Sequence, residues 1–436
     1  MERCAWALPL FVALALLVAM GCDCFAEEYR FNVAEFEKKP YHLGGYAEFR
    51  PIVFGLDRDA ALYRLKFYNR DEGDTTAEYN GTLQLEGSLE KGIGRLFVRL
   101  NNDFQSSYLG KSFRTTVYDG YLSLKPSSSL TIDIGKKSLR WGKGYAWNPV
   151  AFIDRPKDPD DPELNLEGFI VVSADYIKSF DGAVRTISIT PVLLPVYSWL
   201  NDDFGKLRHI NIGGKLYLLA YDTDIDLLFL TGGGKSNRYG VDFSRNITSN
   251  FEVHGEFAYF EDVKKETVDA EGRVAEHEFD TTSWLLGIRY LSESETTYIV
   301  EYYRNGAGFS KGEMQGFFSF IDNGFATYRD NGDDTLLRKA ANLAKSGYAG
   351  MNPLKDYLYV RISQKDPFDT LYFTPAITSI INLNDGSFSL SPEILYTGIT
   401  NLELRLKTNV LVGGNGSEYG EKQNDYRVEL RLRYYF

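Results

Sequence analysis

The last eleven residues alternate strictly between polar and apolar side chains. Successive side chains of a β-strand point to opposite faces, so one face of this segment carries Val428, Leu430, Leu432, Tyr434 and Phe436. The opposite face carries Arg427, Glu429, Arg431 and Arg433. The pattern predicts an amphipathic strand that ends on an aromatic residue.

Similar alternating segments recur along the chain, separated by connections that are by turns short and long. The short ones are residues 91–94, 126–129, 178–182, 221–223, 246–250, 292–296, 364–369 and 398–401. The others are residues 71–77, 102–113, 138–165, 196–207, 232–236, 261–281, 306–353, 382–386 and 413–425. Tight turns at one end and longer loops at the other are typical of transmembrane β-barrels. The chain is therefore predicted to be all-β, forming a single antiparallel transmembrane barrel of about 18 strands, within a range of roughly 16–20.

The beginning of the barrel allows more than one interpretation. Residues 62–70 are expected to form the first regular strand, with Leu65 facing outward. Residues 41–54 also alternate, but Pro51 interrupts them. Because proline cannot donate to a strand ladder, this segment is the start of the first strand, an extra edge segment or a lead-in.

The carboxyl-terminal strand resembles the closing strand of Gram-negative outer-membrane porin-like β-barrels. The resemblance implies a bacterial outer-membrane location, with lipid around the barrel. It also implies that Phe436 is the signal read by the barrel-assembly machinery.

The amino terminus has the pattern of a secretory signal peptide, with a short charged start and an apolar core. We expect cleavage after Ala26, followed by a periplasmic tail at residues 27–40 and the barrel at 41–436. The alternative is a lipoprotein signal acylated at Cys22. All three cysteines, Cys4, Cys22 and Cys24, lie in the segment expected to be removed, so the mature chain would have neither disulfides nor thiolate metal ligands.

Composition narrows the function classes. The chain has 48 basic and 60 acidic residues, a net charge of −12, which argues against a nucleic-acid partner. It also has 30 Tyr and 29 Phe, an excess that suits aromatic girdles at two membrane interfaces. We expect no enzyme, because the chain lacks a Gly-x-Ser-x-Gly elbow and a His-Glu-x-x-His pair and has only four histidines.

Basic side chains gather on the predicted lumenal face near the closure of the barrel. The predicted solute path comprises Arg64, Lys66, Arg95, Arg99, Arg405, Lys407, Arg427, Arg431 and Arg433. Rings of Arg or Lys are used by anion pores, and a narrow channel focuses their field. The alternative is that carboxylates such as Glu86 and Glu90 neutralise these cations, leaving a salt-bridged lining with weak selectivity.

A Gly-Lys-Lys-x-x-x-Trp-Gly run starts at Gly135 and leads to Asn148-Pro149 and an acidic, proline-rich loop. It is weakly similar to the Trp-Gly motif of porin-like families, including alginate-export-like barrels. That similarity implies a constriction loop folded into the lumen, with Arg140, Trp141 and Lys143 near the solute path. The alternative is that the aromatic residues of this run are membrane-interface anchors.

Three further loops carry patterns of their own. Asp158, Asp160 and Asp161 are a weak Ca²⁺ candidate, but the prolines between them favour a solvated loop without metal. Residues 261–281, rich in acid, are expected to be a solvated extracellular loop. Residues 334–346 predict a helix whose apolar stripe caps the barrel mouth or plugs it: Leu336, Leu337, Ala340, Leu343 and Ala344.

Together these features favour a passive outer-membrane channel for small anionic solutes or an acidic polymer, without a cofactor. A homotrimer, as in many porins, is left open. Two alternatives remain open as well: a barrel that sheathes a partner such as a haem protein, as in porin-cytochrome conduits, and a surface adhesin or receptor that works through its acidic loops.

Overall fold

The computed structural model describes residues 39–70 and 72–436. The predicted signal peptide lies outside these residues, as do residues 27–38 of the predicted periplasmic tail. In the described part of the chain, no helix has both the length and the hydropathy needed to cross a membrane.

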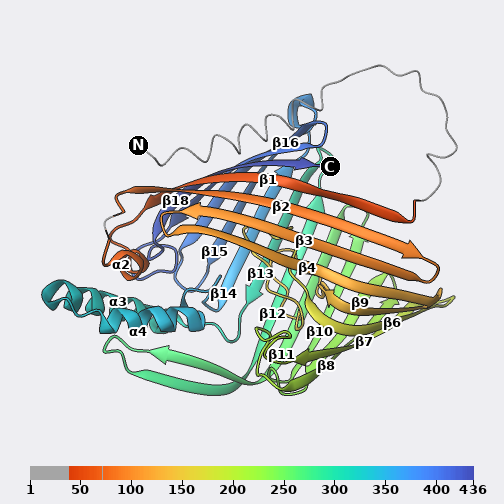
Figure 1. The fold of residues 1–436 in the computed structure, drawn as a ribbon, viewed down its shortest axis with the longest axis horizontal. Helices are drawn as coiled ribbons and strands as arrows, with labels where there is room; N and C mark the ends of the chain where they lie inside the picture. The colour runs from red at the N-terminus through yellow and green to blue at the C-terminus, as the bar shows by residue number, and fades with distance from the viewer. Residues whose placement is uncertain (1–38, 71) are drawn as a thin grey trace. The chain divides into compact units, whose positions relative to one another are not determined.

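Eighteen strands form one antiparallel sheet that closes on itself (Figure 1). Each strand pairs with the next along the chain, and the last strand pairs with the first, for example Phe49 opposite Leu432. The strands are β1 (Tyr41–Leu56), β2 (Thr75–Lys91), β3 (Gly94–Ser107), β4 (Gly110–Ser127), β5 (Leu130–Lys137), β6 (Phe169–Ser179), β7 (Val184–Val196), β8 (His209–Ala220), β9 (Thr223–Thr231), β10 (Arg238–Thr248), β11 (Phe251–Val268), β12 (Val274–Leu291), β13 (Thr296–Arg304), β14 (Asp356–Gln364), β15 (Phe373–Asn382), β16 (Phe388–Ile399), β17 (Leu402–Val412) and β18 (Asn424–Tyr435). The predicted all-β antiparallel barrel of about 18 strands is confirmed.

The two faces of the sheet differ as the alternation predicts. On β18, Val428 and Leu430 are exposed on the outside, whereas Glu429 and Arg431 are each 3% exposed on the inside. On β2, Leu83 and Leu85 face outward while Gln84 is buried and donates to Asn101 Oδ1 at 2.7 Å. An apolar outer face with every strand paired is the surface that a lipid bilayer requires.

The connections define two ends of the barrel. At the end where β1 begins and β18 finishes, neighbouring strands are joined by short turns; this is called the turn end. At the other, the loop end, the longest connections are residues 57–74, 138–168, 197–208, 305–355 and 413–423.

The prediction that residues 62–70 form the first strand is wrong. Residues Ala61–Phe67 are the helix α2, and its apolar side is buried through Tyr63 and Phe67. This segment is not a strand between β1 and β2, because those two strands pair directly with each other. Pro51 is compatible with β1, since it lies where the ladder to β18 skips two residues.

Two connections expected to be long loops are strands instead. β11 and β12 continue through residues 261–281 and meet at a turn near Asp269, with Lys264 Nζ 3.0 Å from Glu276 Oε1 across the hairpin. β3 and β4 likewise continue through residues 102–113. A hairpin that extends beyond the lipid has water on both faces, so its charged residues do not show the apolar alternation that reveals a strand in sequence.

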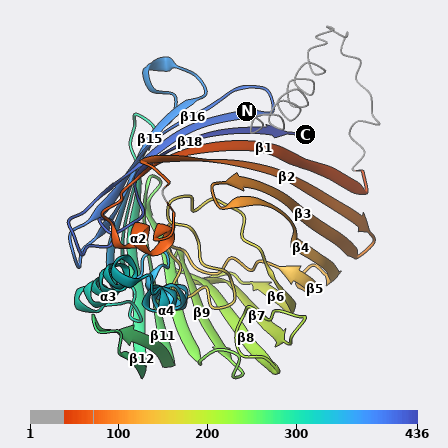
Figure 2. The same cartoon turned by 60° about the vertical axis from the view of Figure 1, so that its left-hand side comes forward.

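The predicted helix in the longest connection is confirmed as α4 (Thr335–Leu343), which runs into the short π-helical segment η2 (Ala344–Tyr348). A longer helix, α3 (Lys311–Asn331), was not predicted; a capping box between Ser310 and Glu313 starts it. Leu337, Ala340 and Leu343 of the predicted stripe are buried in a cluster shared with α3. The stripe therefore packs in a helical cap at the loop end, next to α2 (Figure 2).

Candidate functional site

The loop between β5 and β6, residues 138–168, lies against the inner face of the barrel and is called the inward loop. The backbone amide of Ser138, the first residue of this loop, donates to Asp119 on β4 at 3.2 Å. Further along, it contacts inward-facing side chains of β11, β13, β17 and β18. The loop thus reaches from one side of the lumen to the other.

One buried carboxylate anchors the first half of this loop. Glu256 on β11, 4% exposed, accepts hydrogen bonds from the amides of Lys143 at 2.6 Å, Gly144 at 2.7 Å and Val150 at 3.2 Å. The side chain of Asn148 donates to it as well, at 2.8 Å. A carboxylate that accepts four such bonds satisfies donors that the loop cannot satisfy within itself.

A second buried carboxylate acts beside the first. Glu301 on β13, fully buried, accepts from the amides of Tyr145 and Ala146, the latter at 2.8 Å. His254 on β11 lies 2.8 Å from it through Nε2. The inner wall therefore presents two carboxylates to consecutive amides of the inward loop.

The Trp-Gly motif is buried inside the barrel. Trp141 and Trp147 are 3% and 8% exposed. The ring of Trp147 stacks on Tyr303 with centroids 5.1 Å apart, and its Nε1 donates to Asn352 at 3.1 Å. These rings do not lie at the membrane interface, so the interface interpretation of this run is wrong for both tryptophans.

Its basic residues take different positions. Lys143 Nζ lies 3.0 Å from Asp226 on β9 and 3.9 Å from Asp242 on β10, so it is held by the wall. Arg140 is more exposed and donates to Asn165 within the same loop at 2.9 Å.

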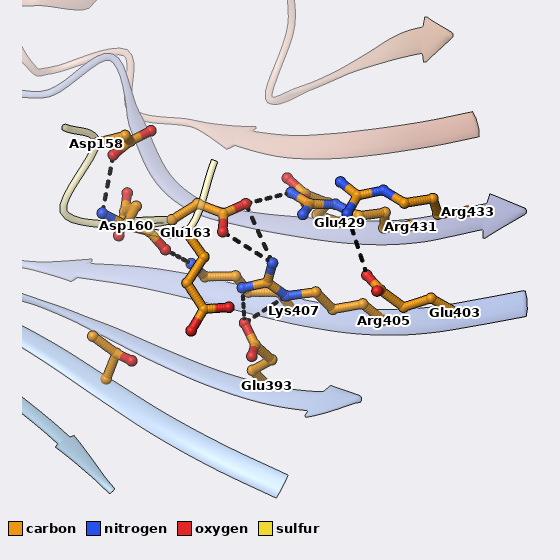
Figure 3. A network of polar contacts seen from close by, with 12 residues as sticks. Asp158, Asp160, Glu163, Glu393, Glu403, Arg405, Lys407, Glu429, Arg431 and Arg433 are labelled. Atoms are coloured by element: carbon orange, nitrogen blue, oxygen red, sulfur yellow. Dashed lines mark hydrogen bonds and ion pairs between the residues drawn. The ribbon is translucent and has the colours of Figure 1, made fainter. Parts of the chain in front are cut away.

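The second half of the inward loop meets the basic residues near the barrel closure (Figure 3). Asp161 lies 2.6 Å from Arg431 and 3.1 Å from Arg405, and Asp160 lies 3.4 Å from Arg427. Lys407 donates to the backbone oxygen of Asp160. We call Arg405, Lys407, Arg427, Arg431 and Arg433 the basic wall.

These contacts keep the loop carboxylate ionised. Burial by itself would raise the pKa of Asp161, but the guanidinium groups of Arg431 and Arg405 outweigh it and hold the pKa well below its usual range. The charged pairs persist across the physiological pH range.

Carboxylates on neighbouring strands complete the neutralisation of the basic wall. Arg433 pairs with Glu48 on β1 at 2.6 Å, and Arg405 donates to Glu393 on β16 at 2.7 Å through Nε. Figure 3 shows Arg405 beside Glu393, and Arg433 on the neighbouring strand beside Glu403. The geometry favours the salt-bridged lining over an open row of cations.

Of the remaining predicted solute-path residues, Arg95 and Arg99 are also paired with carboxylates, whereas Arg64 and Lys66 lie elsewhere. Arg99 contacts Glu86 and Asp119, each at 2.7 Å, and Arg95 lies 3.5 Å from Glu90. The pairing of Arg99 with Glu86 and of Arg95 with Glu90 agrees with the alternative interpretation, in which carboxylates neutralise the lumenal cations. Arg64 and Lys66 were wrongly placed on a lumenal strand, because both belong to α2.

From α2, the side chains of Arg64 and Lys66 contact residues of other segments. Arg64 pairs with Asp322 of α3 at 2.6 Å, and Lys66 lies over the ring of Tyr108 at 5.2 Å.

The three aspartates suggested as calcium ligands make other contacts. Asp160 and Asp161 face cations of the basic wall, and Asp158 accepts from the amide of Asp160 at 2.9 Å. Within residues 39–70 and 72–436, no group of three or more His, Cys, Asp or Glu side chains is placed to hold a metal ion.

The residues that sequence reasoning missed are the anchoring carboxylates. The alternation of Glu252, His254 and Glu256 places these side chains on the inner face, but their sequence cannot show that loop amides more than a hundred residues away need an acceptor. The sequence around Glu301 likewise does not show that its carboxylate accepts hydrogen bonds from the loop. Only the folded loop identifies both.

No family model matches the chain, and no curated protein matches it either. Solved structures of outer-membrane channels do match it, with little sequence identity.

Acinetobacter baumannii OccAB1 superposes with a TM-score of 0.52 and 11% identity, covering 90% of this chain and 96% of its own. The outer membrane protein OprD from Pseudomonas aeruginosa gives 0.50 and 10%, covering 92% and 96%. The chain has the fold of an outer-membrane porin-like barrel. P. aeruginosa OccK2 (OpdF), solved in complex with glucuronate, also matches, with a TM-score of 0.50 and 11% identity over 91% of this chain and 96% of its own. The predicted porin-like barrel is thereby confirmed at the level of fold.

Proposed function

We propose that this protein is a channel of the bacterial outer membrane that lets small hydrophilic solutes, preferentially anions, diffuse passively. The observation that carries this proposal is the inward loop, which crosses a charged lumen and is tied to the wall on both sides. A loop of this kind would narrow the solute path through the lumen. The loop end would face the cell exterior and the turn end the periplasm.

The apolar outer face and the fold shared with outer-membrane channels support the membrane location. OccK2, a protein of the same fold, was solved with glucuronate, a small sugar acid. This agrees with the proposed class of solute. No catalytic role, cofactor or nucleic-acid partner enters the proposal.

Assembly belongs to the same proposal. Phe436 would serve as the signal for the barrel-assembly machinery, and the finished barrel would stand in outer-membrane lipid, alone or as a homotrimer. An acidic polymer is the alternative cargo, for which the inward loop would have to move aside.

The test is single-channel recording of the refolded mature chain in a planar bilayer, with the reversal potential measured across a KCl gradient. We expect a steady conductance and a reversal potential of anion-selective sign. A correctly folded barrel that conducts no ions would contradict the channel. A cation-selective reversal potential would contradict the preference for anions while leaving the channel intact.

A further inference from the structure

A cavity of about 780 Å³ lies at the loop end, between the inward loop and the ends of β10 to β13. This volume is in the usual range for a small-molecule site. The charged side chains that line it are five cations and two carboxylates: Arg140, Arg155, Lys157, Lys235, Arg238, Asp154 and Glu163. We call this space the vestibule cavity.

The two carboxylates are already occupied by the loop itself. Asp154 accepts from the amides of Leu139 at 2.7 Å and Trp141 at 3.0 Å and from the hydroxyl of Ser138 at 3.0 Å. Glu163 accepts from the hydroxyl of Tyr145 at 3.1 Å. They fold the loop and do not pair with the cavity's cations.

Arg155 has carboxylate partners just outside the cavity. Its guanidinium lies 2.6 Å from Asp203 and 3.6 Å from Glu167. Lys157 donates to the backbone oxygens of Gly144 at 2.7 Å and Tyr145 at 3.2 Å, which hold it in place without neutralising it.

Lys235 and Arg238 make no ion pair with any residue of the described chain. The ammonium group of Lys235 lies 3.9 Å from the centre of the Phe204 ring, and the guanidinium of Arg238 lies 5.1 Å from that of Phe260. Arg238 Nε is buried without a hydrogen-bond partner in the described structure. Aromatic faces orient these two cations but leave their charge unmatched.

Lys235 is affected first by its burial and second by the neighbouring charges. Burial, together with the nearby guanidiniums of Arg238 and Arg155, lowers the pKa of Lys235 to about 7, and Asp203 only partly opposes the shift. An anion bound beside Lys235 would oppose both effects and stabilise its charged form.

We propose that the vestibule cavity is a binding site for a small dianionic solute whose acid groups, carboxylate or phosphate, are bound by Arg238 and Lys235. Within the proposed channel, on which this role rests, the solute would be held here before it passes the inward loop. This site would supply the attraction for anions that the neutralised basic wall does not. Binding itself does not depend on conduction.

The test is calorimetric titration of the refolded mature chain in detergent with succinate, with inorganic phosphate, and with succinamide as the uncharged analogue. We expect the dianions to bind and succinamide not to. The stronger of the two dianions identifies the acid group. Lys235→Gln and Arg238→Gln should each weaken binding about tenfold or more, because each removes one charged hydrogen-bond donor.

Arg329→Gln is the matched control. It removes one exposed positive charge from α3 at the same end of the barrel, outside the cavity. Its affinity should equal that of the unchanged chain. Equal weakening by all three substitutions, or equal binding of succinamide, would overturn the proposed site.

The pH dependence gives a second readout. An anion binds the charged form of Lys235, so affinity for succinate should fall as pH rises from 7 to 9, by roughly tenfold for each unit by which the bound anion raises the pKa of Lys235. The groups facing this lysine are Arg238, Arg155 and Asp203. Lys235→Gln should abolish the slope, and an unchanged slope in that variant would contradict the assignment.

The two proposals fail in distinguishable ways. Binding that depends on Lys235 and Arg238 in a barrel that stays silent in the bilayer would retain the site and overturn the channel. A conducting, anion-selective pore that binds neither dianion would retain the channel and overturn the site.

Discussion

Glu256→Ala should raise the single-channel conductance severalfold by detaching the inward loop from the wall. The substitution removes the acceptor of four hydrogen bonds, three from loop amides and one from Asn148. Bonds to an ionised group are each worth about 1.5–3 kcal/mol, so the net loss of only two of the four, about 4 kcal/mol, would raise the detached fraction of the loop roughly a thousandfold. Recordings in a planar bilayer, before and after the substitution, measure the change.

Glu252→Ala is the matched control for this effect. Glu252 lies on the same inner face of β11, where it accepts from the hydroxyl of Ser244 at 3.0 Å and lies 3.6 Å from His254 Nδ1. It accepts no hydrogen bond from the described residues of the inward loop. Its conductance should stay near that of the unchanged chain. If Glu256→Ala folds and conducts as the control does, Glu256 does not fix the width of the path.

Asp161→Asn should move the reversal potential further toward anion selectivity. The substitution removes the negative charge that faces Arg431 and Arg405, leaving part of the basic wall available to passing anions. Each 1.4 kcal/mol of added attraction corresponds to a factor of ten, and partial screening in the lumen suggests a change in the permeability ratio of roughly threefold to tenfold. Reversal potentials across a KCl gradient give the ratio directly.

Glu163→Gln removes a charge from the same loop without touching the basic wall, since its carboxylate bonds to Tyr145. It should shift the reversal potential less than Asp161→Asn does. Equal shifts would mean that only the net charge of the loop matters and that the contact of Asp161 with the wall does not. The heat-dependent mobility of folded barrels on gels confirms that both variants are assembled.

The barrel itself was predictable because a membrane strand obeys a period of two. Leucines face lipid and charged residues face the lumen on β17 and β18, as the alternation requires, and the inward orientation of Arg405 and Arg431 followed from it. The predicted helix at residues 334–346 was visible for a similar reason, through an apolar stripe at helical spacing. Where water contacts both faces, as in the outer parts of β11 and β12, the pattern disappears and the prediction failed.

The partners of the lumenal charges were not predictable. Nothing near Arg431 or Arg405 in the sequence points to Asp161, which is more than two hundred residues away, and Glu256 gives no sign that it anchors a loop. The sequence by itself determined the strand faces and the fold class, because these depend on local periodicity and on contact with lipid or water. The tertiary structure alone decided which cations are neutralised and that Lys235 and Arg238 are not, because ion pairing depends on distances that form only when the barrel closes and the inward loop crosses it.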